Sequence, residues 1–191
     1  MRHSPFTVVY DACVLYPAPL RDFLMWLALS GAFRARWSTQ IHEEWKRNVL
    51  KNRPDLSPAQ LERTISFMNA AIPAATVTEY ESLIEGLALP DPNDRHVLAV
   101  AIRSGASVIV TFNQIDFPID ALAPFGIEAQ HPDEFVEYLF DLDPAAVIAA
   151  AQRQRAELKA PPMEVDRYLD NLLRHGLVQT VKSLGIYRAI L

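Results

Sequence analysis

The 191-residue sequence is poor in the residues that build several common kinds of site. Its six glycines are scattered, so no glycine-rich loop is available to cradle the phosphates of a nucleotide. Its five histidines lack the paired spacing of zinc ligands, and its single cysteine, Cys13, cannot form an internal disulfide. These absences argue against nucleotide hydrolysis through a phosphate loop, against a zinc centre and against a disulfide-stabilised secreted fold.

Long apolar runs and a secretory leader are also missing. No run approaches the ~18 uninterrupted apolar residues of a membrane span, and the amino terminus lacks the basic and apolar pattern of a signal peptide. We therefore expect a cytoplasmic protein with no membrane association. Hydrophobic residues make up 50% of the chain, which is ample for a globular core.

Positive charge is in deficit, because the formal net charge is −5. Nucleic-acid binders usually gain affinity from Lys and Arg on phosphates, so the total is unfavourable for that function. The stretch from residue 34 to residue 53 is locally basic, however. Within it we predict that Arg34, Arg36, Lys46 and Arg47 contact a phosphate backbone, while a solvated surface helix is the simpler alternative.

Strands alternate with helices through the first two thirds of the chain. Runs of β-branched and aromatic residues predict strands over 7–10, 34–37, 75–78 and 107–111. Helical spacing and capping residues predict helices over 20–29, 39–51, 57–72 and 91–105. Because each crossover must pack a helix back on the sheet, this alternation predicts an α/β fold with a parallel sheet.

The pattern after Asp141 is helical only, with expected helices over 145–159, 164–174 and 178–187 and a break at Pro161-Pro162. We therefore expect two parts, a main domain over residues 1–140 and a helical extension over residues 141–191.

Four carboxylates stand where such a fold could direct them at one cavity: Asp11, Glu44, Asp94 and Asp116. Asp11 and Asp116 follow predicted strands, and ligands of parallel sheets bind beyond the carboxyl ends of strands. Glu44 shares the apolar face of its helix with Ile41, and Asp94 lies in the first turn of the next helix. Together they predict a site for a hard divalent cation that assists phosphodiester hydrolysis.

Three neighbouring residues are candidates for supporting roles. The Thr111 hydroxyl could orient a carboxylate, although a strand threonine needs no such role. Asn113 could join the site or form a turn with Asp116. Asp91 is well explained as a helix cap before Pro92.

Other polar residues near the acids have simpler explanations. Glu43 precedes Arg47 by four residues, so we expect a solvated ion pair. Cys13 is expected to be a small packed hydrophobe. His42 and His96 lie near candidate acids, but isolated histidines are usually surface or satisfied groups, so neither is assigned to the site.

Four sequence motifs carry a resemblance to a known family. They are Val8-Val-Tyr-Asp11, Ile41-His-Glu-Glu44-Trp45, Asp91-Pro-Asn-Asp94 and Val110-Thr-Phe-Asn113-Gln-Ile-Asp116-Phe-Pro118, of which the last is the most specific. Over most of residues 6–140 the chain resembles the PIN-domain ribonuclease family, in particular the toxins of bacterial VapC-type toxin–antitoxin systems. The tail beyond Asp141 resembles the helical extension of one subgroup of these toxins.

The resemblance implies a three-layer α/β/α sandwich with a short parallel sheet. It also implies Mg²⁺- or Mn²⁺-dependent cleavage of RNA, a homodimer and an antitoxin partner. Asp11, Glu44, Asp94 and Asp116 match the acidic quartet of the family. Asn113 stands where many members carry another Asp, which makes a second metal ion less firmly held.

Two alternatives remain open from the residues themselves. A phosphatase could use Asp11 as a nucleophile, although the second acid expected two residues later is absent. A non-catalytic regulatory module could instead bind RNA, or a protein partner whose arginine enters the acidic pocket.

Overall fold

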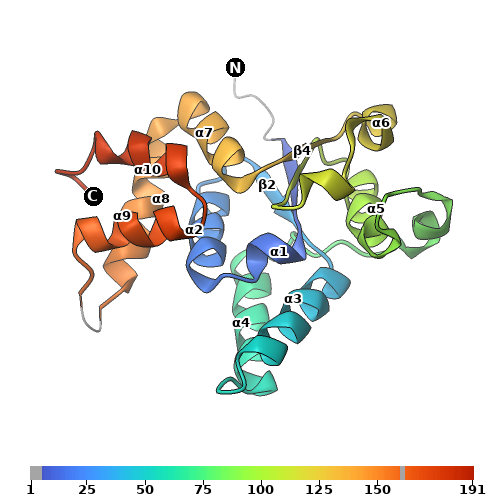
Figure 1. The fold of residues 1–191 in the computed structure, drawn as a ribbon, viewed down its shortest axis with the longest axis horizontal. Coiled ribbons are helices and arrows are strands. Elements are labelled where there is room, and N and C mark those ends of the chain that lie inside the picture. The colour runs from blue at the N-terminus through green and yellow to red at the C-terminus, as the bar shows by residue number, and fades with distance from the viewer. Residues whose placement is uncertain (1–5, 160–161) are drawn as a thin grey trace.

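The computed structural model describes residues 6–159 and 162–191. Its centre is a four-stranded parallel sheet in the order β2-β1-β3-β4, with helices on both faces (Figure 1). The strands are β1 (Thr7–Tyr10), β2 (Arg34–Arg36), β3 (Val108–Val110) and β4 (Glu128–Gln130). This arrangement confirms the predicted α/β sandwich with a short parallel sheet.

The described residues contain ten α-helices and four short 3₁₀ turns. The helices of the first two thirds are α1 (Ala12–Leu15), α2 (Ala18–Ala28), α3 (Thr39–Asn52), α4 (Pro58–Ala71), α5 (Arg95–Ser104) and α6 (Ile119–Leu122). The remaining helices are α7 (Pro132–Leu142), α8 (Pro144–Glu157), α9 (Val165–Arg174) and α10 (Val178–Gly185). The 3₁₀ turns are η1 (Glu81–Gly86), η2 (Pro92–Asp94), η3 (Gln114–Asp116) and η4 (Ala123–Phe125).

Local capping explains where several of the predicted helices begin or end. The Ser38 hydroxyl accepts a hydrogen bond from the Ile41 amide at the start of α3. Ser57 and Gln60 form a reciprocal capping box at the start of α4, where Pro58 occupies the first turn. Gly105 ends α5 in the left-handed conformation, with φ of 63°.

Two local predictions need correction, and two elements had no prediction. The strand expected over 75–78 is wrong, because only a single bridge joins Trp37 and Thr76. The helix expected from residue 91 starts instead with η2, and α5 follows it. Strand β4 and helix α7 were not predicted, since the short sequence Glu-Ala-Gln of β4 contains no β-branched or aromatic residue.

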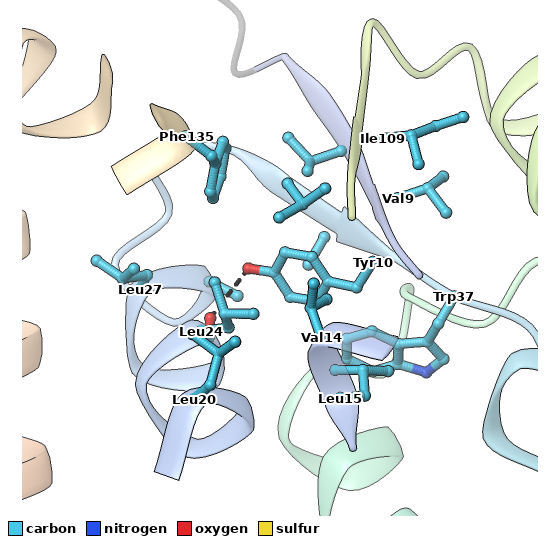
Figure 2. Packing of buried hydrophobic residues seen from close by; sticks show 14 of the residues in the cluster. Val9, Tyr10, Val14, Leu15, Leu20, Leu24, Leu27, Trp37, Ile109 and Phe135 are labelled. Atoms are coloured by element: carbon cyan, nitrogen blue, oxygen red, sulfur yellow. Dashed lines mark hydrogen bonds between the residues drawn. The ribbon is translucent and has the colours of Figure 1, made fainter. Parts of the chain in front are cut away.

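The hydrophobic core lies on both faces of β1. The Tyr10 side chain points toward α2 and donates a hydrogen bond to the carbonyl of Leu24 at 3.0 Å. Figure 2 shows Tyr10 on the same side as Phe135 of α7, while Val9 and Ile109 lie on the other side of the strand. Because β1 is buried throughout, Asp11 at its carboxyl end is carried into the interior of the protein.

The C-terminal helices pack against α2 and α7 (Figure 1). The buried Gln154 of α8 donates to the carbonyl of Pro19 at 2.7 Å and accepts from the Tyr168 hydroxyl of α9 at 2.8 Å. All three predicted C-terminal helices are present with slightly different bounds, while Pro161 of the predicted break lies outside the described residues. Within residues 6–159 and 162–191, no helix is long and apolar enough to cross a membrane.

Candidate active site

Asp11 is fixed at the carboxyl end of β1 by hydrogen bonds to both carboxylate oxygens. Its Oδ1 accepts from the Ala12 amide at 2.6 Å and so caps α1. Its Oδ2 accepts from the Thr111 hydroxyl at 2.7 Å. These hydrogen bonds hold the carboxylate in one orientation.

The pKa of Asp11 is raised overall. Burial and the Glu44 charge raise the pKa, and the hydrogen bonds from Thr111 and Cys13 lower it by less.

Thr111 lies beside Asp11 because β1 and β3 are adjacent parallel strands. The side chain is fully buried, and its hydroxyl accepts from the Asn113 amide at 2.9 Å while it donates to Asp11. One hydroxyl thus links Asp11 to the loop that follows β3.

Cys13 is more than the packed hydrophobe that the sequence suggested. Its thiol donates to Asp11 Oδ2 at 3.1 Å and accepts from the Phe112 amide at 3.3 Å. Burial, followed by the Asp11 charge, raises the pKa of the Cys13 thiol well above its ordinary value, so the sulfur stays protonated and remains a donor. Asp11 stands two residues before Cys13, but the sequence does not show that Thr111 and Phe112 contact the same sulfur, because they reach it only through the fold.

Glu44 lies on α3 and pairs with a histidine that the sequence did not assign to the site. The distance from Glu44 Oε2 to His96 Nε2 is 3.1 Å. His96 is buried on α5, and its Nδ1 has no hydrogen-bond partner among the described residues. The only signal in the sequence is that His96 follows Asp94 by two residues.

His42 behaves as the satisfied histidine that the sequence suggested. Its Nδ1 accepts from the indole of Trp45 at 3.0 Å, and its Nε2 lies 3.3 Å from Asn69 Oδ1. Burial lowers the pKa of His42 to about 4, so the ring is neutral near neutral pH.

Asp94 is the least satisfied of the four acids. Among the described residues its carboxylate accepts no hydrogen bond and joins no ion pair. Burial and the charges of Asp11, Asp91, Asp116 and Glu44 together raise the pKa of Asp94 to about 7. The acids are therefore close enough to repel one another.

Asp91, Asn113 and Asp116 make local turns. Asp91 Oδ1 accepts from the backbone and side-chain nitrogens of Asn93 at 2.8 and 2.9 Å, as expected of a cap. The Asn113 side-chain amide donates to Asp116 Oδ2 across η3. Asn113 thus forms the turn contact that the sequence left as one of two roles.

A cleft of about 490 Å³ collects part of the predicted site. It is lined by Gln40, Glu43, Glu44, Arg47, Asn48, Asp91, Asn93, Asp94 and His96. Asp11 and Asp116 are not among these lining residues. In the part of the chain that the structure describes, no three His, Cys, Asp or Glu side chains stand close enough together to hold a metal ion as they are. The acids gather within electrostatic reach, but not at coordination distance.

The four predicted basic residues are in different environments. Arg47 lines the cleft beside Glu44 and Asp94. Lys46 binds Glu43 at 2.6 Å and also Glu62, so Glu43 pairs with Lys46 rather than with the predicted Arg47. Arg34 and Arg36 lie on β2 in register with Thr7 and Val9, before the end of β1 that carries Asp11.

The fold and the acids at one edge of a parallel sheet define a class of α/β protein with an acidic site. Residues 7–114 match the family model described as PIN domain, and residues 132–185 match the one described as VapC50 C-terminal domain. The chain therefore belongs to the PIN-domain family and carries the C-terminal extension found with it. The PIN match includes Asp11, Glu44 and Asp94 and ends just before Asp116.

A particular relative agrees with this assignment. The chain is 44% identical over 79 residues to a curated protein of Mycobacterium tuberculosis (strain ATCC 25618 / H37Rv) that bears the name "Putative ribonuclease VapC50". The aligned segment covers 41% of this chain and 47% of the relative, so the match spans about half of the relative's length. No solved structure matches the chain. The family inferred from the motifs is thus confirmed.

Proposed function

We propose that this protein is a divalent-metal-dependent endoribonuclease that hydrolyses RNA phosphodiester bonds, and that it acts as the toxin of a toxin–antitoxin pair. Asp11, Glu44, Asp94 and Asp116 are the proposed ligands of Mg²⁺ or Mn²⁺. The observation that carries the proposal is the carboxylate of Asp94, which is partly buried, lacks a protein partner among the described residues and is repelled by four other acids. Family membership and the name of the relative support the RNA substrate.

The residues present fit a hard divalent cation. Carboxylate oxygens are the ligands that Mg²⁺ and Mn²⁺ prefer, and the charges of the neighbouring acids accumulate at Asp94. Repulsion between ionised carboxylates favours the spread arrangement of the ion-free protein. Asp11, Glu44 and Asp116 are each held by a hydrogen bond to another residue, so Asp94 is the acid most free to turn toward an ion.

Other residues of the chain orient the proposed ligands. Thr111 and Cys13 orient Asp11, and His96 orients Glu44. A bound divalent ion supplies an activated water and neutralises charge on the phosphate oxygens.

Arg47 is the best placed of the predicted basic residues to contact an RNA phosphate, since it lines the acidic cleft. Lys46 is neutralised by two glutamates, so we propose a smaller contribution from it. Arg34 and Arg36 are the first and last residues of β2 and pair with Thr7 and Val9, so we propose that they contact RNA beside β1 rather than at Asp11 itself.

The two alternatives fit these contacts less well. An aspartyl phosphatase is expected to carry a second acid two residues after its nucleophile, whereas this chain has Cys13 there, whose thiol donates to Asp11 Oδ2. A non-catalytic module whose acidic pocket accepts a partner's arginine is compatible with inhibition by an antitoxin, so it describes a second state of the same site.

The substitution Asp11→Asn tests the nuclease. We expect purified Asp11→Asn to lose Mn²⁺-dependent cleavage of total cellular RNA while its circular dichroism spectrum stays unchanged. Asp55→Asn is the matched control, because Asp55 is exposed and pairs only with Arg53 among the described residues. Undiminished RNA cleavage by Asp11→Asn would reject the assignment. The proposed homodimer is tested separately by light scattering, for which a monomer at micromolar concentration is the contrary result.

A further inference from the structure

The loop after β3 exposes two large apolar side chains beside the acids. Phe112 is 36% exposed and Ile115 is 81% exposed. Asn113 and Gln114 lie between them, and Asp116 follows Ile115 directly. Such side chains on a loop are ordinary when they are isolated, but here they adjoin Thr111, whose hydroxyl holds Asp11.

The Phe112 ring is held by separate parts of the chain. It meets the His131 ring edge-on, with centroids 5.2 Å apart and an interplanar angle of 67°. The backbone amide of Phe112 donates to Cys13 Sγ at 3.3 Å. Gly176 approaches both rings, and a Cβ at this position would lie 3.4 Å from Phe112 Cε1 and 3.6 Å from His131 Cε1. These contacts hold the ring in place while Phe112 stays partly exposed.

The C-terminal extension keeps Gly176 in place. Asp133, near the start of α7, accepts hydrogen bonds from the Gln179 amide, the Thr180 amide and the Thr180 hydroxyl at 2.8 to 2.9 Å. These contacts anchor the first turn of α10 on α7, two residues after Gly176 (Figure 1). Gly176 itself has φ of 85°, a conformation that disfavours other residues. The extension thus supports the loop next to the acidic site.

We propose that Phe112 is a base-stacking platform, on which an unpaired RNA base beside the scissile phosphate packs, with Ile115 as an apolar wall. This inference rests on the proposed nuclease function. A nucleobase fits because it is flat and apolar on its faces, and aromatic side chains bind successive unpaired bases in this way. A base inside a duplex is already stacked, so the platform selects unpaired positions. A pre-ordered ring also loses little conformational freedom on binding.

The test measures binding apart from cleavage. The variant Asp94→Asn serves as a cleavage-deficient parent, and fluorescence anisotropy in Mg²⁺ follows a labelled single-stranded 12-mer of adenosines. Adding Phe112→Ala should weaken binding by about 5- to 100-fold, and Phe112→Tyr should restore it. Phe67→Ala is the matched control, since Phe67 is 68% exposed on α4 and lines a different groove. A 12-mer of abasic sugar-phosphate should bind with equal affinity to the parent and to the protein that carries Phe112→Ala.

A second pair of variants tests the support from the extension. Gly176→Ala should weaken binding of the adenosine 12-mer, because alanine disfavours the φ of 85° at this position and the backbone packed against the Phe112 ring must then shift. Gly185→Ala should not, because a Cβ there meets nothing within 4 Å. Thermal melting confirms that each variant is folded.

Two results would overturn the platform. One is equal affinity of the Phe112→Ala and parent proteins for the adenosine 12-mer, and the other is no binding by either. If Phe112→Ala has no effect while the wild-type protein still cleaves RNA, the platform fails and the nuclease stands. If binding depends on Phe112 but the wild-type protein cleaves nothing, the platform stands and the nuclease fails.

Discussion

Binding of a divalent ion to this protein should depend steeply on pH, because Asp94 must lose a proton first. The pKa of Asp94 is about 7, owing to burial and to the charges of Asp11, Asp91, Asp116 and Glu44. With that pKa the carboxylate is about 90% ionised at pH 8 and about 1% ionised at pH 5. Only the ionised form is a ligand, so apparent affinity for Mn²⁺ should fall about 90-fold between these pH values.

If the pKa of Asp94 were unperturbed, the apparent affinity for Mn²⁺ would hardly change between pH 5 and pH 8. With its ordinary pKa of 3.8, more than about 90% of the carboxylate is already ionised at pH 5. Asp11, whose pKa is also raised by burial, adds to the loss of affinity in the same direction.

Isothermal titration calorimetry with Mn²⁺ between pH 5 and pH 8 measures this dependence. Repeating each titration in two buffers of different ionisation enthalpy counts the protons released. Asp94→Asn should bind more weakly at pH 8 and show a flatter pH dependence. Glu43→Gln should keep the wild-type slope, since Glu43 lines the same cleft but pairs with Lys46. A change in wild-type affinity below about twofold from pH 8 to pH 5 would refute the reasoning.

Two further predictions concern stability. Burial lowers the pKa of His42 from 6.5 to about 4 in the folded protein. The neutral ring therefore contributes fully to the free energy of unfolding above pH 6.5, and this contribution is lost as the pH falls toward 4. Urea denaturation should show wild type losing up to about 3 kcal/mol more than His42→Gln between pH 7 and pH 4; equal losses would contradict this. Asp133→Ala removes the acceptor of three hydrogen bonds to α10 and should lower the melting temperature by about 5 to 10 °C. Asp143→Ala, which removes only the surface cap of α8, should lower it less, and a reversed order would count against the anchoring role.

Strong local signals made the main elements predictable from the sequence. The run of buried residues in β1 and the capping residues Ser38 and Ser57 act within a few positions of themselves, so a sequence pattern contains them. Strand β4 escaped prediction because its three residues pair with β3 without an apolar or β-branched pattern. Its place is set by the neighbouring strand rather than by its own side chains.

The sequence pointed to four acids and to Thr111 as candidates, but it did not show most of the contacts around them. Asp11 and Asp116 follow strands, and strand ends meet at one edge of a parallel sheet. The contacts that the sequence did not reveal join distant parts of the chain, such as His96 with Glu44 and the Phe112 amide with Cys13. A single sequence does not show which isolated histidine or cysteine the fold brings next to an acid.

Asp94 and Asp133 show why an unsatisfied acid is informative. Both lie at the start of a helix. The fold brings three donors to Asp133 from a segment about 46 positions away, and its charge is used to join α7 to α10. The same fold brings other acids to Asp94, which makes its ionised form unfavourable in the ion-free protein. A carboxylate that serves stability would resemble Asp133, so the environment of Asp94 supports the role proposed for it as a ligand of a cation.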